Sequence, residues 1–478
     1  MQNDIETFTQ EFRLTGSGDK FDWQVGAYYF KEDIRTVNSL PFGEDFRAFA
    51  NVNVAALGGA QALALFNGFD NALLNGSFVP FGIAQTSAPF FDADSGIQEI
   101  GTLDNEAISL FGQFDYHIND RLTASVGLNF TSDEKEATVT QSPSDIFSGL
   151  PLSDIFSNPF VQGAFGLDAT TAAASVAGLS PLQFLPPLVD LNSGDPESET
   201  SDDELTYTLR LAYDLSDNLN LYASYATGFK ASSFNLSRDS FVGNRFAEPE
   251  EATVFEVGLK GRFERGAFNI ALFDQSLENF QSNTFIGTGF ALSNAEEQSV
   301  YGAEFDITYY PVDALQITFA ATLLEPEFDS FTQGTAVRLE NGDPFIADLS
   351  GAQPAGIHEA SFSLAATYNF DIGNNKAFLR GDFYFEDEVQ ITDNVPAGTV
   401  IFPTSGTVAV INGVRETKNL NLSAGLTTQN GYNFSIWARN VTDHETLIST
   451  FPGIAQLGTF NGYRNEPRTY GVSLSKEF

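Results

Sequence analysis

Apolar and polar residues alternate one by one through much of the chain. Between residues 254 and 263 one side of the alternation is apolar and the other mostly polar: the first holds Phe255, Val257, Leu259, Gly261 and Phe263, the second Val254, Glu256, Gly258, Lys260 and Arg262. Only a β-strand separates neighbours in this way, because its successive side chains point to opposite faces. The same alternation recurs over residues 122–130 and 359–370.

This pattern predicts fifteen strands and an all-β, antiparallel fold. The strands begin near residues 5, 21, 103, 121, 203, 219, 251, 267, 296, 314, 358, 376, 414, 432 and 466. Many exceed the usual soluble strand of about five or six residues. They reach the roughly nine to eleven residues that a tilted membrane-spanning strand needs.

The connections between these strands alternate in length. Tight turns rich in Gly, Pro and polar residues fall at 16–20, 119–120, 216–218, 264–266, 311–313, 373–375 and 429–431. Longer stretches fall between them, at 35–102, 138–200, 231–250, 330–356, 387–415 and 447–465. Short turns at one end and long loops at the other are typical of an outer-membrane barrel.

The two longest loops contain alanine-rich stretches, 48–74 and 160–188, for which we predict short surface helices. Their apolar residues favour packing within the loops, since long ordered loops usually fold on themselves. A partner-binding face is the alternative.

A membrane barrel also fixes which face each side chain takes. A position against hydrocarbon must be apolar, whereas a lumen position can be charged or small. We therefore expect Glu304 and Asp306 to point inward, and Phe305 and Ile307 to point outward. Next to a short turn, the tyrosines at 309–310 suit the aromatic girdle at the inner interface.

Composition narrows the functional classes. The 478 residues include 63 acidic and 23 basic side chains, for a formal net charge of -40, and no cysteine. This charge would repel phosphate backbones and argues against nucleic-acid binding. The lack of cysteine excludes disulfides, cysteine-ligated metals and a thiol nucleophile. No apolar run is long enough for a membrane-spanning helix, and the first thirty residues lack the features of a secretion signal.

The last strand carries a candidate assembly signal. Tyr470, Val472, Leu474 and Phe478 alternate with small or polar residues, and the chain stops on the aromatic ring. This arrangement resembles the signal read by the outer-membrane assembly machinery. Lys476 takes an outward position where an apolar residue is usual, and its ammonium group could reach the headgroups.

The number of strands predicts where the chain begins relative to the membrane. With the C-terminus on the short-turn side, fifteen strands put Met1 on the long-loop side. A single-chain bacterial barrel has an even number of strands. We therefore expect that an N-terminal part of the protein is missing from this sequence.

Taken in order, several segments resemble the barrel of TonB-dependent receptors. They are residues 224–230, 248–250 and 256–260 for a middle hairpin, and 439–443 and 467–472 for the closing strands. The resemblance covers residues 1–478 as one barrel domain, incomplete at its N-terminus. It implies a transmembrane barrel of about 22 strands, with the plug, the TonB-contacting box and the first strands absent from this sequence.

The resemblance also implies a function and partners. Such a receptor imports a large scarce nutrient across the outer membrane, such as a ferric siderophore, cobalamin or an oligosaccharide. Its partners would be outer-membrane lipid, lipopolysaccharide and the barrel assembly machinery, with the TonB complex only if the missing N-terminal part is present. The alternatives are a passive channel or structural barrel, and a soluble adhesin or lectin with polar residues on both faces.

No catalytic constellation is evident, so we expect neither an enzyme nor a cofactor. The three histidines are far apart in sequence and are expected to be solvated: His117, His358 and His444. Acidic clusters at 195–199, 202–204, 248–251 and 386–388 are expected to be solvated charge, with divalent cations, alone or bridging to lipopolysaccharide, as the alternative. Acidic loops would also disfavour an anionic ligand.

Overall fold

Fifteen antiparallel strands form one continuous sheet in the computed structural model. The structure describes residues 2–183, 190–236, 245–285, 290–338, 344–391, 400–401, 409–410, 413–452 and 460–477. The strands, in sheet order, are β1 (Gln2–Ser17), β2 (Phe21–Pro41), β3 (Gly96–Asn119), β4 (Leu122–Pro143), β5 (Glu199–Ser216), β6 (Leu219–Lys230), β9 (Glu250–Phe263), β10 (Gly266–Phe285), β11 (Phe290–Val312), β12 (Leu315–Ser330), β15 (Ala360–Ile372), β16 (Asn375–Gln390), β19 (Val414–Thr427), β20 (Tyr432–Arg439) and β23 (Thr469–Lys476). All fifteen predicted strands are confirmed.

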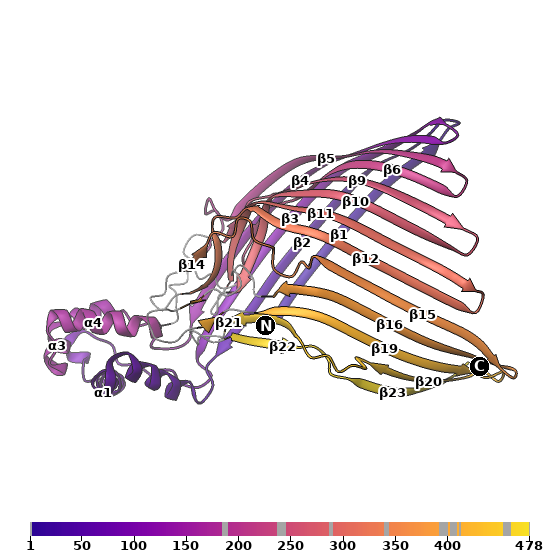
Figure 1. Cartoon of the computed structure of the whole chain (residues 1–478). Coiled ribbons are helices and arrows are strands. Elements are labelled where there is room, and N and C mark those ends of the chain that lie inside the picture. The colour runs from indigo at the N-terminus through magenta and orange to yellow at the C-terminus, as the bar shows by residue number, and fades with distance from the viewer. Residues whose placement is uncertain are drawn as a thin grey trace.

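The short turns and the long connections lie at opposite ends of this sheet. Figure 1 shows the turns at one end, where the C-terminus also lies, and the helices at the other. The predicted loop bounds were too wide, because β2 and β3 remain paired as far as Pro41 and Gly96. β11 begins at Phe290 instead of near residue 296, since β10 and β11 remain paired as far as Phe285 and Phe290. The alternation of apolar and polar residues is irregular near these strand ends, so sequence alone ended the strands too early.

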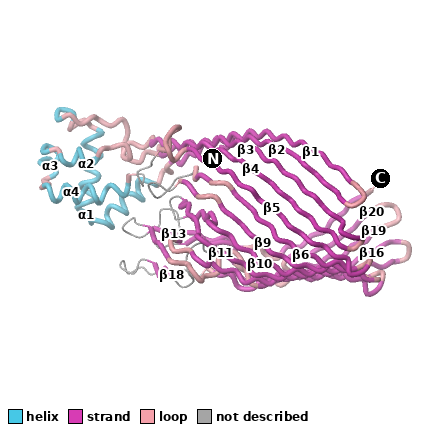
Figure 2. Tube along the Cα trace, turned by 90° about the horizontal axis from the view of Figure 1, so that it is seen from above, coloured by secondary structure: helices cyan, strands magenta, loops and turns pink. Residues whose placement is uncertain are grey.

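Helices lie at the long-loop end (Figure 2), as do four small two-stranded sheets. The hairpins join β7 (Ser233–Phe234) to β8 (Phe246–Ala247), β13 (Gly334–Arg338) to β14 (Pro344–Ala347), β17 (Val400–Ile401) to β18 (Ala409–Val410), and β21 (Leu447–Pro452) to β22 (Phe460–Arg464). The helical elements are α1 (Phe46–Leu74), η1 (Val79–Phe81), α2 (Leu152–Ser157), α3 (Pro159–Phe165), α4 (Ala169–Leu179) and η2 (Ser180–Leu182). None of the described helices is both long and apolar enough to cross a membrane.

The two longest loops share one hydrophobic core, as expected from packing within the loops. Its largest fully buried side chains come from both loops: Phe66, Phe69, Phe90, Phe147 and Phe156. The predicted helices are confirmed for 48–74 and for the described part of 160–188, of which 184–188 lie outside the described residues. Asp168 caps α4, and hydrogen bonds from the Thr171 backbone N–H and hydroxyl lower the pKa of its carboxyl group.

The two faces of the sheet differ as predicted. Glu304 and Asp306 lie opposite Ala271 and Asn269 on one face, here called the inner face, whereas Phe305 and Ile307 lie on the other. Outer-face side chains are exposed rather than packed into a core: Leu272 is 59% exposed, Leu364 43% and Leu422 46%. A soluble sandwich would bury these rows, so the large apolar area left uncovered counts against the soluble adhesin.

Aromatic side chains mark the turn end of the outer face. Tyr309 lies opposite Gly266, and its ring centroid is 6.0 Å from that of Phe263. Tyr309 and Tyr310 are each 39% exposed. This position beside a tight turn agrees with the expected aromatic girdle.

A charged substitution on the outer face tests its contact with hydrocarbon. We predict that Leu364→Arg destabilises the folded barrel by about 2–4 kcal/mol, the cost of an arginine near the bilayer midplane. Ser363→Arg is the matched control, because its side chain is exposed on the inner face. Urea unfolding from phospholipid vesicles measures both, and equal losses of stability would contradict the assignment of faces.

Candidate functional site at the long-loop end

The connection between β6 and β9 folds over the inner face of the sheet. Phe234 and Leu236 of this connection pack with Val139 and Leu103, which lie on the inner faces of β4 and β3. Gly101 permits this close approach, since a Cβ there would lie 3.1 Å from Leu236 Cβ. The connection is thereby held against strands that are distant in sequence.

Beneath this connection lies a pocket of about 420 Å³, in which polar side chains alternate with a larger apolar surface. The pocket lies between two pairs of strands: β2 and β3 form one wall, and β10 and β11 form the other. The residues that line it are Thr36, Asn38, Glu99, Lys230, Ser233, Phe234, Asn235, Leu236, Gln281, Asn283 and Leu292. Ligand sites characteristically combine such a concavity with a few fixed polar groups.

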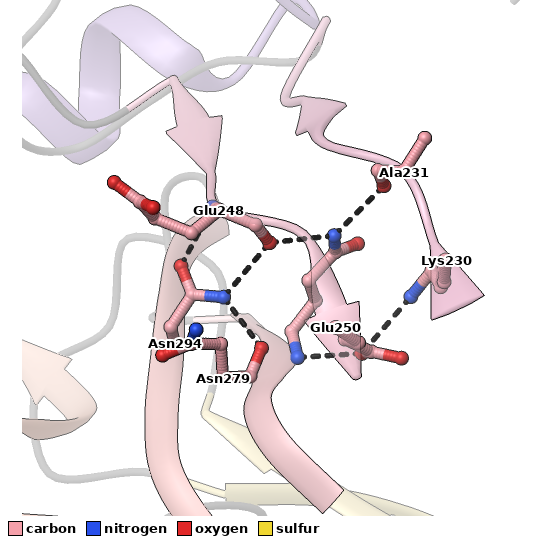
Figure 3. Close-up of polar contacts among 7 residues, drawn as sticks. Lys230, Ala231, Glu248, Glu250, Asn279 and Asn294 are labelled. Carbon is pink, nitrogen blue, oxygen red and sulfur yellow. Dashed lines mark hydrogen bonds and ion pairs between the residues drawn. The ribbon is translucent and has the colours of Figure 1, made fainter. Parts of the chain in front are cut away.

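The Gln281 side chain ties together the two ends of the β6–β9 connection. Its Nε2 donates to the carbonyl oxygens of Ala231, at 3.0 Å, and Glu248, at 2.9 Å. Its backbone N–H donates to Glu250 Oε1 at 2.6 Å, and Lys230 Nζ lies 3.2 Å from the same oxygen (Figure 3). One side chain on β10 therefore fixes both ends of the connection.

Asn294 adds a second set of bonds from the neighbouring strand. It lies directly opposite Gln281 in the β10–β11 ladder. Its Nδ2 donates to the carbonyl oxygens of Glu248 and Asn279, and its Oδ1 accepts from the Glu248 backbone N–H at 2.9 Å (Figure 3). We name Gln281, Asn294 and Glu250 the latch.

A buried carboxylate forms part of the opposite wall. Glu99 is 3% exposed and faces Asn38 across β2 and β3. Its Oε2 accepts from Asn38 Nδ2 at 2.9 Å, and its Oε1 accepts from Gln141 Nε2 at 3.2 Å. Buried carboxylates need such donors, because desolvation of an unpaired charge is costly.

The histidines do not come together, and His358 is less solvated than expected. His117 hydrogen-bonds Asp22 and Thr123 near the turn end. His358 is 19% exposed and lies 3.7 Å from Glu386, while His444 Nε2 lies 3.0 Å from the Glu416 carbonyl oxygen. The expectation was therefore wrong for His358, whereas His444 is only partly buried.

Several members of the acidic clusters accept hydrogen bonds from neighbouring loop or strand residues. Asp195 accepts from Asn192, Asp202 accepts from Ser232, and Glu386 accepts from Tyr384 and Thr417. Of these, only Glu386 is largely covered, with its side chain 14% exposed, so the expectation of solvated charge was wrong for Glu386, whereas Asp195 and Asp202 are partly exposed. Within the described ranges, no three His, Asp or Glu side chains converge as metal ligands.

The strand proposed as an assembly signal lies at one edge of the sheet. Tyr470, Val472 and Leu474 project from the outer face, and the first two are more than 80% exposed. Lys476 Nζ lies 4.8 Å from the Tyr432 ring centroid, a cation–π contact that favours a lysine at this position. Phe478 lies outside the described residues. The signalling role stays a prediction.

Sequence reasoning did not find the pocket, although one clue was present. The family-like segments 224–230 and 248–250 end at the pocket: Lys230 lines it, and Glu248 and Glu250 belong to its support. Gln281 and Glu99 carried no signal, because their partners are distant in sequence.

The long antiparallel strands, the segregated turns and the exposed apolar face define an outer-membrane-type β-barrel wall. The family model "TonB dependent receptor-like, beta-barrel" matches residues 2–442. The chain therefore belongs to the TonB-dependent receptor barrel family, whose members are transport receptors rather than enzymes.

Solved structures agree on the fold. The chain is similar to the ferric yersiniabactin uptake receptor FyuA from Yersinia pestis, with TM-score 0.62, 13% identity and coverage of 100% of this chain and 54% of that one. It is also similar to the siderophore receptor PiuA from Acinetobacter baumannii, with TM-score 0.61 and 16% identity. The match covers 99% of this chain and 55% of PiuA. For the copper transporter OprC the TM-score is 0.56 at 10% identity. The match covers 100% of this chain and 57% of OprC. The chain thus spans little more than half the length of the receptors it matches.

Removal of the latch amide tests how the pocket is held. We predict that Gln281→Leu frees both ends of the β6–β9 connection, since each lost neutral hydrogen bond contributes about 0.5–1.5 kcal/mol. Amide hydrogen exchange at Ala231 and Gln281 should accelerate at least about fivefold. Asn283→Ser, two residues further along β10 at an exposed position, is the control. Unchanged exchange in Gln281→Leu would show that the latch does not hold the connection.

Proposed function

We propose that this chain forms the barrel wall and ligand-capturing mouth of an outer-membrane importer of the TonB-dependent type. The observation that carries the proposal is the pocket at the long-loop end, with polar groups fixed by the latch on β10 and β11. A pocket at this end meets ligands arriving from outside the cell. An inert structural barrel has no need for such a pocket.

Iron chelates are the ligand class that the similar structures suggest. FyuA takes up ferric yersiniabactin and PiuA is a siderophore receptor, whereas OprC transports copper. At sequence identities of 10–16%, the residues that line the pocket can differ between these proteins. The similar structures therefore suggest a class of ligand but not a particular ligand. We accordingly propose a ferric siderophore or a chelate of similar size.

Energy coupling separates this importer from a passive channel. The complete gene product, placed in the outer membrane of a strain that lacks its own ferric-chelate receptors, should accumulate radiolabelled ferric chelate. Accumulation should fall at least about tenfold when a protonophore collapses the inner-membrane gradient, since import would draw on that energy through TonB. Unchanged accumulation, together with a steady conductance in planar bilayers, would favour the passive channel.

The free strand edge of β23, at the end of the described sheet, is proposed to engage the assembly machinery. Tyr470, Val472 and Leu474 form an apolar row with one backbone edge unpaired within the described sheet. An unpaired strand edge is a template for pairing with another strand. Outer-membrane lipid and lipopolysaccharide are the expected surroundings of the assembled wall.

Substitution in this row tests the assembly proposal. Val472→Asn should lower the amount of heat-modifiable, membrane-inserted protein several-fold, because it removes an apolar side chain from the outer face. Ser473→Asn changes the adjacent inner-face position and should leave assembly unchanged. Equal assembly of both variants would remove the support for a signal at this strand.

A further inference from the structure

We propose that the outer face of β2, β3, β4 and β5 binds a lipid whose headgroup carries an ammonium group. An acyl chain of this lipid lies in an apolar groove, and the ammonium group lies at a set of carboxylates nearer the long-loop end. The proposal concerns the membrane side of the wall and does not depend on which ligand is imported. Two hollows on the same four strands carry it, one apolar and one acidic.

The first hollow, here called the groove, is a notch of about 680 Å³ in the apolar outer face. It forms at Gly112 on β3, which lies between Val25 on β2 and Leu128 on β4. Because glycine has no side chain, its large neighbours stand around a gap that none of them fills. Further apolar side chains that line the groove are Trp23, Leu110, Phe114, Val126, Phe130 and Leu205.

An acyl chain is the occupant that fits this groove. Outer-face positions at this level meet hydrocarbon rather than water. A hollow that stays empty loses dispersion contacts with its lining, whereas a methylene chain that enters it regains them. The groove therefore favours an ordered acyl chain, but it does not select a headgroup.

The second hollow, here called the acidic hollow, lies on the same face toward the long-loop end and measures about 600 Å³. Glu106 lines it and lies four residues before Leu110 of the groove, about 13 Å along β3. The row between the two hollows is neutral and holds Tyr29, Ile108 and Ser132. The apolar, neutral and acidic zones thus follow one another as they do in an amphiphile.

Opposed carboxylates characterise the acidic hollow. Asp104 on β3 lies directly opposite Asp33 on β2 and Glu136 on β4. Desolvation, a hydrogen bond with Asp33 and the charges of Asp33 and Glu136 raise the pKa of the Asp104 carboxyl group. Like charges directly opposite each other are destabilising, so a bound cation would relieve this repulsion. The other carboxylates that line the hollow are Glu106, Glu134 and Glu199.

The cations of the chain neutralise these carboxylates only in part. Among the described residues that line the acidic hollow, the cationic ones are Lys31 and Lys135. Lys31 lies opposite Glu106, and its Nζ is 3.7 Å from Asp33 Oδ1. Lys135 pairs with Asp133, which is on the inner face of β4. The outer face therefore keeps an excess of negative charge that a cationic group of a ligand can balance.

An ammonium group suits this arrangement better than a chelated metal ion. Chelation needs several oxygens that converge on one point. In the part of the chain that the structure describes, no three acidic or histidine side chains do so. A primary ammonium group instead donates separate hydrogen bonds to separate carboxylates, and such charge-assisted bonds are strong.

Native mass spectrometry of the chain in detergent micelles tests the headgroup. The chain is offered equal amounts of phosphatidylethanolamine and phosphatidylglycerol with identical acyl chains, with and without Mg²⁺. We expect phosphatidylethanolamine to be retained about three- to fivefold more than phosphatidylglycerol in both conditions, as for an exposed ion pair. Equal retention in either condition, a preference for phosphatidylglycerol, or retention of neither lipid would overturn the proposal.

Filling the groove tests where the acyl chain lies. Gly112→Leu should lower the retention of both lipids at least about threefold, because its side chain would occupy the groove. A Cβ at Gly112 would come no closer than 3.5 Å to its neighbours Gln24 and Val25, so the strand can accept a side chain. Gly127→Leu is the matched control, on the inner face of β4 with a similarly open position. Unchanged retention in Gly112→Leu would contradict the assigned groove.

Removing two carboxylates tests the headgroup contact without altering the groove. The double variant Glu106→Gln with Glu134→Gln should bring retention of the two lipids close to equal, because this opposed pair lines the acidic hollow. The control is Glu251→Gln with Glu278→Gln, an opposed and exposed pair on the outer face of β9 and β10, which should keep the preference. A preference that persists in the first variant, or that is lost in both, would overturn the proposal.

Discussion

The structure depends on one constraint, which is that backbone N–H and C=O groups in hydrocarbon must be satisfied by one another. A continuous antiparallel ladder achieves this within the sheet, and it explains why strands as long as β3 and β11 pair along nearly their whole length. Once the backbone is paired in this way, the outer side chains need only be apolar. The inner side chains remain free to carry charge and chemistry.

The inner face uses that freedom to lay large aromatic side chains flat along the wall. Tyr222 lies over Gly258, where a Cβ would come within 2.4 Å of the ring, and its hydroxyl donates to Glu256 at 2.7 Å. Arg210 and Lys260 lie 4.9 and 5.2 Å from the same ring centroid. Glycine opposite an aromatic side chain recurs at Gly302 with Phe273, Gly425 with Phe378 and Gly26 with Phe111. Such cross-strand pairs cover the glycines of the inner face and favour one strand register.

The strands of the wall could be predicted well from the sequence, because the features that define a strand or a turn lie in neighbouring residues. Alternation identifies a strand from its own residues, and the turn residues of 373–375 or 264–266 need no partner elsewhere in the chain. The strand ends near Pro41 and Gly96 were missed for the opposite reason, since only the pairing of the two strands extends them. The helices were predicted from alanine-rich composition, but their shared core joins Phe66 to Phe147 across two separate loops. The pocket is least predictable: Gln281 acts on Ala231 and Glu248, and Glu99 acts on Asn38, at separations that a single sequence does not reveal.

The latch also explains how the strands of the wall determine the position of the β6–β9 connection, which covers the pocket. Gln281 and Asn294 lie in the short part of the β10–β11 ladder beyond the break at Asn279, where paired residues on both sides fix their backbones. The β6–β9 connection has little regular structure of its own within the described residues, only the two-residue strands β7 and β8. Its position is therefore set by where the wall places two amides. A change in the relative position of β10 and β9 would reach the pocket directly, because Glu250 begins β9 and accepts from the backbone of Gln281. The wall and the β6–β9 connection are in this sense one mechanical unit, because the same β10–β11 ladder that forms the wall also holds both ends of the connection.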